Sequence, residues 1–203
     1  MNTVKIDKKN CRMIAHRGVS GLEKENTCAA FVAAGVKTYY GIETDVHVTA
    51  DGEYFIFHDD NMKRIAGVDM DIERSTAEQL RTVRMPDTDG KTFRSDLVVP
   101  ALKDYISICG KYDKTAVLEL KNPMERKHVL NIAALVKDMG WLDRTIFISF
   151  AKENLVILRE EYRYADLQFL TGEASDENFE FMKRYRLGAD LCGACVSREY
   201  VSR

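Results

Sequence analysis

The segment GIETDVHVT, residues 41–49, decides the fold of this chain. Its polar and apolar residues alternate, which is typical of a β-strand because successive side chains point to opposite faces of the sheet. One face carries Ile42, Thr44, Val46. The other face carries Glu43, Asp45, His47. A strand in a parallel sheet is covered on both faces, and burying an unpaired carboxylate there is costly. The segment therefore predicts a buried strand whose acidic face meets a cation.

A second acidic strand is predicted at AVLELK, residues 116–121. The same alternation places Glu119 and Lys121 on the face opposite Leu118 and Leu120. If both strands belong to one sheet, three carboxylates converge. Ca²⁺ and Mg²⁺ are hard cations that bind carboxylate oxygens and leave positions for water or substrate. We therefore predict a site for Ca²⁺ or Mg²⁺ whose ligands are Glu43, Asp45, Glu119.

Two histidines and two basic residues accompany these strands. His16 ends the apolar run at residues 12–16, and His58 ends the run at residues 54–58. Imidazoles titrate near neutral pH, so one can deprotonate a nucleophile while the other protonates a leaving oxygen. Arg17 and Lys121 supply the positive charge that an anionic phosphate group needs. A divalent cation, two histidines and two basic side chains together favour phosphodiester chemistry.

The rest of the chain alternates short apolar runs with segments of helical periodicity. For example, TAVLELK at residues 115–121 is followed by ERKHVLNIAALVKDMG. Such alternation predicts parallel strands joined by helical crossovers, and therefore an α/β fold. Without repeats or linkers, we expect one domain over residues 1–203, with a rim loop or small insertion at about residues 59–100. Candidate helix caps are Asn26, Ser75, Asp176.

Composition and charge argue against several classes of function. The chain has 30 basic and 32 acidic side chains and a net charge of −2, which gives no support to nucleic-acid binding through bulk charge. It contains neither a signal-peptide core nor a run approaching the ~18 apolar residues of a membrane span. We therefore expect no transmembrane segment and a cytoplasmic location. Its five cysteines lack disulfide-framework spacing, and Cys192 and Cys195 lack a thioredoxin-like context despite their redox spacing.

Four segments, in order and with similar gaps, resemble a known family. They lie between residue 12 and about residue 121 and are IAHRGVSGLEKENTCAAFVAAG, IETDVHVTADGEYFIFHDDNMKR, VPALKDYISICGKY, AVLELK. In these segments the chain resembles the glycerophosphodiester phosphodiesterase family. The resemblance implies a TIM-type (β/α)8 barrel. It also implies hydrolysis of glycerophosphodiesters to glycerol 3-phosphate and an alcohol, with Ca²⁺ or Mg²⁺ as the cofactor.

The positions of the motifs imply roles for seven residues. The catalytic histidines of the family fall on His16 and His58, and its phosphate-contacting cations fall on Arg17 and Lys121. Its metal ligands fall on Glu43, Asp45, Glu119. The resemblance further implies that a glycerol hydroxyl of the substrate attacks first and that water then opens a cyclic phosphate. The expected partner is therefore a small-molecule phosphodiester.

The sequence departs from the family pattern in two places. Residues 64–67 are RIAG, whereas family members usually carry RTT.G. The chain also ends at CVSREYVSR, before a tryptophan-threonine strand and a threonine-aspartate strand that the resemblance implies. A barrel without its closing segment leaves strand edges unpaired. We therefore expect either a truncated product, or a chain that completes itself by strand swapping or as a homo-oligomer.

Several alternatives remain open from the sequence. The three carboxylates form a structural ion network with Arg17 and Lys121 if no cation binds. His47 is expected to be structural, and Asn26 either caps the following helix or braces the site. The alternative functions are a related phosphodiesterase that acts on lysophospholipids or another phosphodiester, and a truncated, catalytically silent binding relic.

Overall fold

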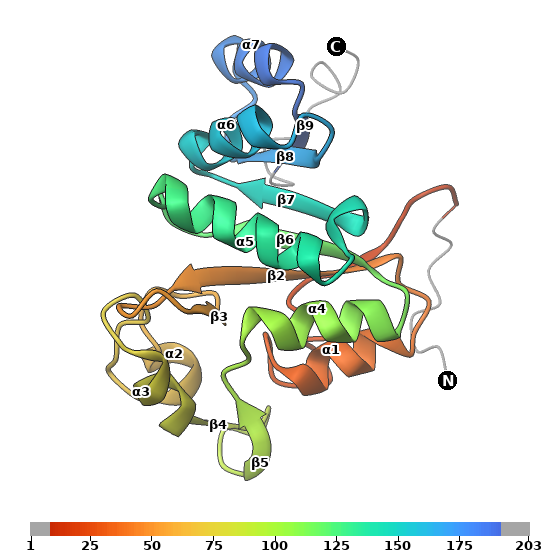
Figure 1. Cartoon of the computed structure of the whole chain (residues 1–203). Helices are drawn as coiled ribbons and strands as arrows, with labels where there is room; N and C mark the ends of the chain where they lie inside the picture. The colour runs from red at the N-terminus through yellow and green to blue at the C-terminus, as the bar shows by residue number, and fades with distance from the viewer. Residues whose placement is uncertain (1–8, 192–203) are drawn as a thin grey trace.

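The computed structural model describes residues 9–191, which form a mostly parallel sheet with helices packed against it (Figure 1). Six strands lie in the order β1-β2-β6-β7-β8-β9, and neighbours in this order are parallel. A seventh strand, β3, pairs antiparallel with β2. The strands are β1 (Ile14–Ala15), β2 (Gly41–Val48), β3 (Tyr54–Ile56), β6 (Thr115–Leu120), β7 (Thr145–Ser149), β8 (Asp166–Thr171), β9 (Gly188–Leu191).

The longer helices connect successive strands and cover one face of the sheet (Figure 1). The main core lies between this face and the helices, and it buries Ile42 and Val46 of β2 together with Leu118 of β6. These are the apolar positions of the alternating pattern, so the opposite face is left to the acidic residues. The helices are α1 (Cys28–Gly35), α4 (Leu102–Lys111), α5 (Arg126–Asp138), α6 (Lys152–Glu161), α7 (Asp176–Tyr185), with a 3₁₀ turn at Leu142–Arg144 before β7.

The sheet curls into part of a barrel. Ile14 of the first strand and Asp190 of the last strand line the same cavity, of about 490 Å³, as Val117 and Ile146 of the central strands. Within residues 9–191, β1 and β9 do not pair with each other. The prediction of an α/β barrel of the TIM type that lacks its closing segment is therefore confirmed for the part of the chain that the structure describes.

The segment between β3 and α4 forms a separate small layer (Figure 1). Two strands in it pair antiparallel as a hairpin outside the main sheet. Its own apolar cluster includes Met62, Leu80 and Leu97, which are fully buried. The least periodic stretch of the sequence thus has its own core. Its elements are α2 (Lys63–Ala66), α3 (Ala77–Thr82), β4 (Arg84–Pro86), β5 (Phe93–Val98).

Three helix caps lie one residue away from their expected positions. The N-caps of α1, α3 and α7 are Thr27, Thr76, Ser175. Each of these side chains accepts a hydrogen bond from a backbone N–H in the first turn of its helix. At each site two neighbouring residues are able to cap, so composition alone does not choose between them. At α1 the expected cap, Asn26, is instead free to point into the candidate site.

Two further expectations concern membranes and thiols. Among residues 9–191, no helix combines the length and the apolar character that crossing a membrane requires. Cys11, Cys28 and Cys109 are free thiols. Burial raises the pKa of Cys28 to about 11 and that of Cys109 to about 12, so both are protonated at neutral pH. Cys192 and Cys195 lie outside the described residues.

Candidate active site

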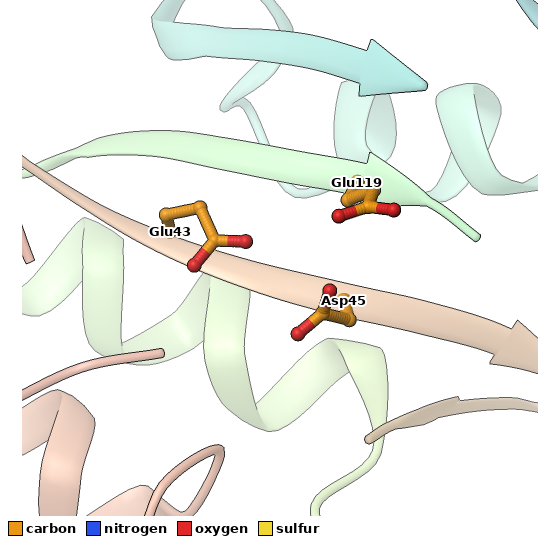
Figure 2. Close-up of side chains that lie close together, drawn as sticks. All are labelled: Glu43, Asp45 and Glu119. Atoms are coloured by element: carbon orange, nitrogen blue, oxygen red, sulfur yellow. The ribbon is translucent and has the colours of Figure 1, made fainter. Parts of the chain in front are cut away.

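Three carboxylates meet on the face of the sheet opposite the helices (Figure 2). Glu43 and Asp45 lie two residues apart on β2, and the register of the sheet places Glu119 of β6 directly beside Asp45. One oxygen from each carboxylate lies within 4.8 Å of the others. All three side chains are buried. We call Glu43, Asp45 and Glu119 the carboxylate cluster.

Burial and mutual repulsion disfavour the charged forms of this cluster. Burial, followed by the charge of Asp45, raises the pKa of Glu43 well above its ordinary value. The same two causes raise the pKa of Glu119 to about 7, although Lys121 opposes them. Like charges gathered in a place of low dielectric constant repel strongly. A bound cation would reverse this effect, because it stabilises the ionised form of each ligand.

The cluster fits a hard divalent cation. Oδ1 of Asp45 and Oε1 of Glu119 are buried and accept no hydrogen bond in the described part of the chain. Buried polar atoms are normally satisfied by hydrogen bonds, so two neighbouring oxygens without one, here called the orphaned oxygens, are available to a further positive partner. Oxygens that bind one Ca²⁺ at about 2.3–2.6 Å lie within about 5 Å of one another, as these do.

Lys121 and Arg17 flank the cluster, as the sequence predicts. Nζ of Lys121 lies 3.0 Å from Oε1 of Glu119 and 3.5 Å from Oδ1 of Asp45, as ion pairs that lack hydrogen-bond geometry. Burial alone would lower the pKa of Lys121, but Asp45 and Glu119 raise it above its ordinary value. Lys121 therefore stays charged without satisfying the orphaned oxygens.

Arg17 is held at the site by its backbone as well as by its side chain. Its N–H donates to Oε2 of Glu43 at 2.8 Å, and its Nε lies 3.9 Å from Oδ2 of Asp45. The backbone turns sharply here, since Arg17 has φ 55° and Gly18 has φ 75°. A Cβ at Gly18 would lie 2.6 Å from the carbonyl carbon of Ala30, so only glycine fits after Arg17.

His16 lies at the open side of the cluster. Its Nε2 is 3.9 Å from Oε2 of Glu43, and 69% of its side chain is exposed. Burial of part of the ring and the charge of Arg17 lower its pKa below 6.5. His16 is therefore neutral at pH 7 and able to accept a proton. It also lines the cavity of about 490 Å³, a volume suited to a small molecule.

His58 is oriented by its neighbour Asp59. Nδ1 of His58 lies 2.8 Å from Oδ1 of Asp59. Hydrogen bonds from Arg64 lower the pKa of Asp59 to about 2, so this carboxylate is ionised and only accepts hydrogen bonds. Nδ1 of His58 must therefore carry the hydrogen in this contact. Nε2 is left as the ring atom that exchanges a proton with a ligand.

Asn26 braces the cluster rather than capping α1. Its Nδ2 donates to Oδ2 of Asp45 at 2.8 Å, and its Oδ1 accepts from the hydroxyl of Thr44 at 2.7 Å. Asn26 is buried and has a left-handed backbone with φ 54°. The sequence left open whether Asn26 caps the following helix or braces the site. The observed contacts show that it braces the site.

His47 shares the acidic face of β2 but belongs to different surroundings. Its ring is fully buried, and its Nδ1 lies 3.0 Å from Oε1 of Glu73. Asn122 also donates to this carboxylate oxygen. Nε2 of His47 is buried and has no hydrogen-bond partner among residues 9–191. A structural role for His47 stays a prediction.

Sequence reasoning missed three residues around the histidines, namely Glu25, Asp59 and Arg64. Arg64 donates to both Asp59 and Glu25, and Glu25 also accepts from Arg17. Asp59 follows His58 directly, so adjacency was a usable signal. Glu25 and Arg64 are 39 positions apart, and nothing local in the sequence connects them.

Known proteins are similar to this chain in sequence and in fold. A model of the glycerophosphoryl diester phosphodiesterase family matches residues 16–188. The chain is 29% identical to the uncharacterised protein YqiK of Bacillus subtilis over 167 residues, which are 80% of this chain and 67% of that protein. It is 28% identical to the glycerophosphodiester phosphodiesterase of Caldanaerobacter subterraneus over 144 residues, 68% of this chain and 57% of that enzyme. The matches thus span 57–67% of the length of these relatives.

Among solved structures, one neighbour is an Oleispira antarctica phosphodiesterase in complex with the product sn-glycerol-3-phosphate. Its TM-score is 0.84 at 23% identity, and the superposition covers 95% of this chain and 79% of that chain. At this level of identity the likeness shows that the two chains share a fold. The neighbour therefore supports the curled parallel sheet independently of the sequence motifs.

Proposed function

Because the chain belongs to the glycerophosphoryl diester phosphodiesterase family, as its motifs predict, we propose that it hydrolyses glycerophosphodiesters to glycerol 3-phosphate and an alcohol. The proposed reaction depends on Ca²⁺ or Mg²⁺ and uses His16 and His58 as general base and general acid. The proposed substrate is a small glycerophosphodiester such as glycerophosphocholine.

One observation carries this proposal: the carboxylate cluster has two orphaned oxygens beside two cationic residues. A cluster that served only as a structural ion network would be expected to satisfy its acceptors with Lys121 and Arg17. Instead, Lys121 lies beside one buried oxygen of Asp45 and one of Glu119 without hydrogen-bond geometry, so both oxygens can still accept a further partner. Glu43, Asp45 and Glu119 are therefore the proposed metal ligands.

The two basic residues are proposed to bind the phosphate. Lys121 stays charged because Asp45 and Glu119 raise its pKa, so a point charge is held next to the metal ligands. The guanidinium of Arg17 supplies planar donors that match phosphate oxygens. With the phosphate held by these two side chains, the diester would lie across the cluster, with His16 on one side.

His16 is the proposed base and His58 the proposed acid. The lowered pKa of His16 keeps its ring neutral, so Nε2 can take the proton of the attacking hydroxyl. With its Nδ1 hydrogen held toward Asp59, His58 would act as the acid in its imidazolium form, which carries a second proton on Nε2 and delivers it to the alcohol oxygen as the P–O bond breaks. A divalent cation bound to the cluster would supply Lewis-acid stabilisation of the charge that develops on the phosphoryl oxygens.

The test is phosphorus NMR of the 203-residue chain incubated with glycerophosphocholine, first with Ca²⁺ or Mg²⁺ and then with excess EDTA. The expected result is a glycerol 3-phosphate signal that EDTA abolishes and that added metal restores. A lysophospholipid in a parallel sample tests whether the leaving group differs from the proposed one.

The matched control is His128→Ala, because His128 is a histidine of α5 that contacts Tyr54 outside the cluster. This variant should release product at the wild-type rate. Product that forms equally with and without EDTA would contradict the metal-dependent mechanism. A folded wild-type chain that converts neither substrate would contradict the proposed activity.

A further inference from the structure

Three charged side chains link His58 to Arg17 around the rim of the site. The first half of this link runs from His58 to Arg64. Nδ1 of His58 lies 2.8 Å from Oδ1 of Asp59. Arg64 grips the same carboxylate with two donors, from Nε to Oδ2 at 2.6 Å and from Nη2 to Oδ1 at 2.8 Å. This bidentate geometry fixes the orientation of Asp59.

The second half of the link runs from Arg64 to Arg17 through Glu25. Nη2 and Nη1 of Arg64 donate to the two oxygens of Glu25 at 2.9 Å and 3.2 Å. Oε1 of Glu25 also accepts from Nη1 of Arg17 at 2.9 Å. We call Asp59, Arg64 and Glu25 the rim bridge. Arg17 and His58 are 41 positions apart, and the rim bridge connects the loops that carry them.

Both carboxylates of the rim bridge are held ionised. Hydrogen bonds from Arg64 lower the pKa of Asp59 to about 2. Partial burial would raise the pKa of Glu25, but hydrogen bonds from Arg64 and Arg17 lower it below its ordinary value. Ionised carboxylates only accept hydrogen bonds, so each N–H donor that contacts them must point toward a carboxylate oxygen. The bridge therefore restricts the rotamers of His58 and Arg17 at the same time.

From this geometry we infer that Arg64 and Glu25 are positioning residues. They hold the side chains of the proposed acid His58 and the proposed phosphate ligand Arg17 in a fixed relative orientation. This inference rests on the proposed function, since it assigns these roles to His58 and Arg17. Arg64 belongs to RIAG, the segment that departs from the family pattern, and the arginine is the part of it that contacts Asp59. A substrate atom misplaced by about 1 Å can lower the reaction rate by about 100-fold, so loss of the rim bridge should be visible as a lower turnover rate.

The structure offers a matched control for the rim bridge. Arg94 of β5 donates to Glu23 at 2.8 Å, so it ties the same loop to the same small layer only two residues away from Glu25. Arg94 otherwise contacts Asp87 and Asp96. Neither Arg94 nor Glu23 contacts His58 or Arg17 through these bonds. Losing the Arg94–Glu23 contact should therefore loosen the loop without touching the proposed site.

The first experiment compares steady-state kinetics of five variants on glycerophosphocholine. Arg64→Ala should lower kcat by about 10- to 100-fold, and Arg64→Lys should recover only part of this loss, because lysine keeps the charge but not the two-donor grip. Glu25→Gln should mainly raise KM, by about 10-fold, because it releases Arg17. Arg94→Ala and its partner change Glu23→Gln should stay within about twofold of wild type. Equal losses in Arg64→Ala and Arg94→Ala, with unchanged melting temperatures, would overturn the inference.

A second readout requires no activity, so failure of the inference stays separate from failure of the proposed function. Nitrogen-15 NMR of the substrate-free chain reports which ring nitrogen of His58 carries the hydrogen, above the pH where the imidazole is charged. Wild type and Arg94→Ala should show hydrogen on Nδ1, and Arg64→Ala should shift the population toward Nε2. An unchanged tautomer in Arg64→Ala would contradict the positioning role, whether or not the wild-type chain turns over substrate.

Discussion

The carboxylate cluster and the rim bridge are both networks of charged groups, yet they are built on different parts of the fold. Glu43, Asp45 and Glu119 project from two neighbouring strands and are at most 7% exposed. The rim bridge lies on loops and on the short helix α2, and half of the Arg64 side chain is exposed. The cluster therefore has its geometry imposed by backbone pairing, whereas the bridge makes its own geometry through side-chain contacts.

This difference has an energetic consequence. Buried carboxylates with orphaned oxygens destabilise the metal-free chain, because burial raises their pKa values and repulsion adds to the cost. The rim bridge pairs every charge with an opposite one and remains in contact with water, so its net effect on stability is small. Changes in the cluster should thus alter both activity and metal-free stability, and changes in the bridge should alter activity alone.

The largest effect is expected from Asp45→Asn. Asp45 contacts Lys121, Arg17 and Asn26 and is a proposed metal ligand. Losing a metal contribution of several kcal/mol corresponds to a fall in kcat/KM of roughly 1,000-fold. The control is Asp113→Asn, because Asp113 is exposed, pairs with Arg144 and has a positive φ that asparagine tolerates. Wild-type rates for Asp45→Asn would place the metal elsewhere.

His16→Ala tests the proposed general base. His16 is exposed, and it approaches the carboxylate cluster from outside. The loss of a general base should lower kcat by ~100-fold or more, while the melting temperature changes little because most of the side chain is exposed. Stopped assays that follow glycerol 3-phosphate measure the effect. Activity within a few-fold of wild type would remove His16 from the proposed mechanism.

Asn26 is expected to have an intermediate effect, and two variants separate its side chain from its backbone. Asn26→Gly and Asn26→Ala both remove the hydrogen bonds to Asp45 and Thr44, so each should weaken metal binding by about 10-fold. Asn26→Ala should be less stable than Asn26→Gly by about 1 kcal/mol, because φ is 54° at this position. Denaturant unfolding gives the stability difference, and equal stability of the two variants would refute the backbone argument.

The smallest expected effect is the pH dependence of metal-free stability. The pKa of Glu119 is raised to about 7 in the folded chain, whereas an unfolded glutamate titrates near pH 4.3. Between these values the folded state binds more protons than the unfolded state, so the free energy of unfolding falls as pH rises. In EDTA, the melting temperature should decrease by roughly 5 °C from pH 5 to pH 8. A melting temperature that rises over this range would contradict the account of the cluster.

The features that could be predicted from the sequence are those set by the strands, as in the carboxylate cluster, and not those made by contacts between loops, as in the rim bridge. Alternation in β2 and β6 places Glu43, Asp45 and Glu119 on one face, because a strand has a fixed period of two, and the parallel sheet brings them together. The α/β class follows from alternating strand and helix patterns for the same reason. A rim loop or small insertion was expected at about residues 59–100, but its own core could not be foreseen, since that core is formed by short elements without a long periodic pattern.

Side-chain networks between loops could not be predicted from the sequence either. Glu25 and Arg64 meet because the loop before α1 and the helix α2 lie side by side, and no local spacing records that contact. Asn26 was assigned two roles because Thr27, beside it, caps the helix equally well by composition. Residues that function through a tertiary contact are thus visible only once the chain has folded.

The most direct test of the central claim is a calorimetric titration of Ca²⁺, and separately of Mg²⁺, into EDTA-stripped wild type and Glu119→Gln. Glu119 is chosen because glutamine keeps its shape while removing the charge and one acceptor oxygen that has no hydrogen bond. The account predicts one site per wild-type chain, and binding weakened by roughly 100-fold in the variant, whose metal-free melting temperature should be equal or higher. Identical metal binding by the two proteins would contradict the claim that the carboxylate cluster holds the cation.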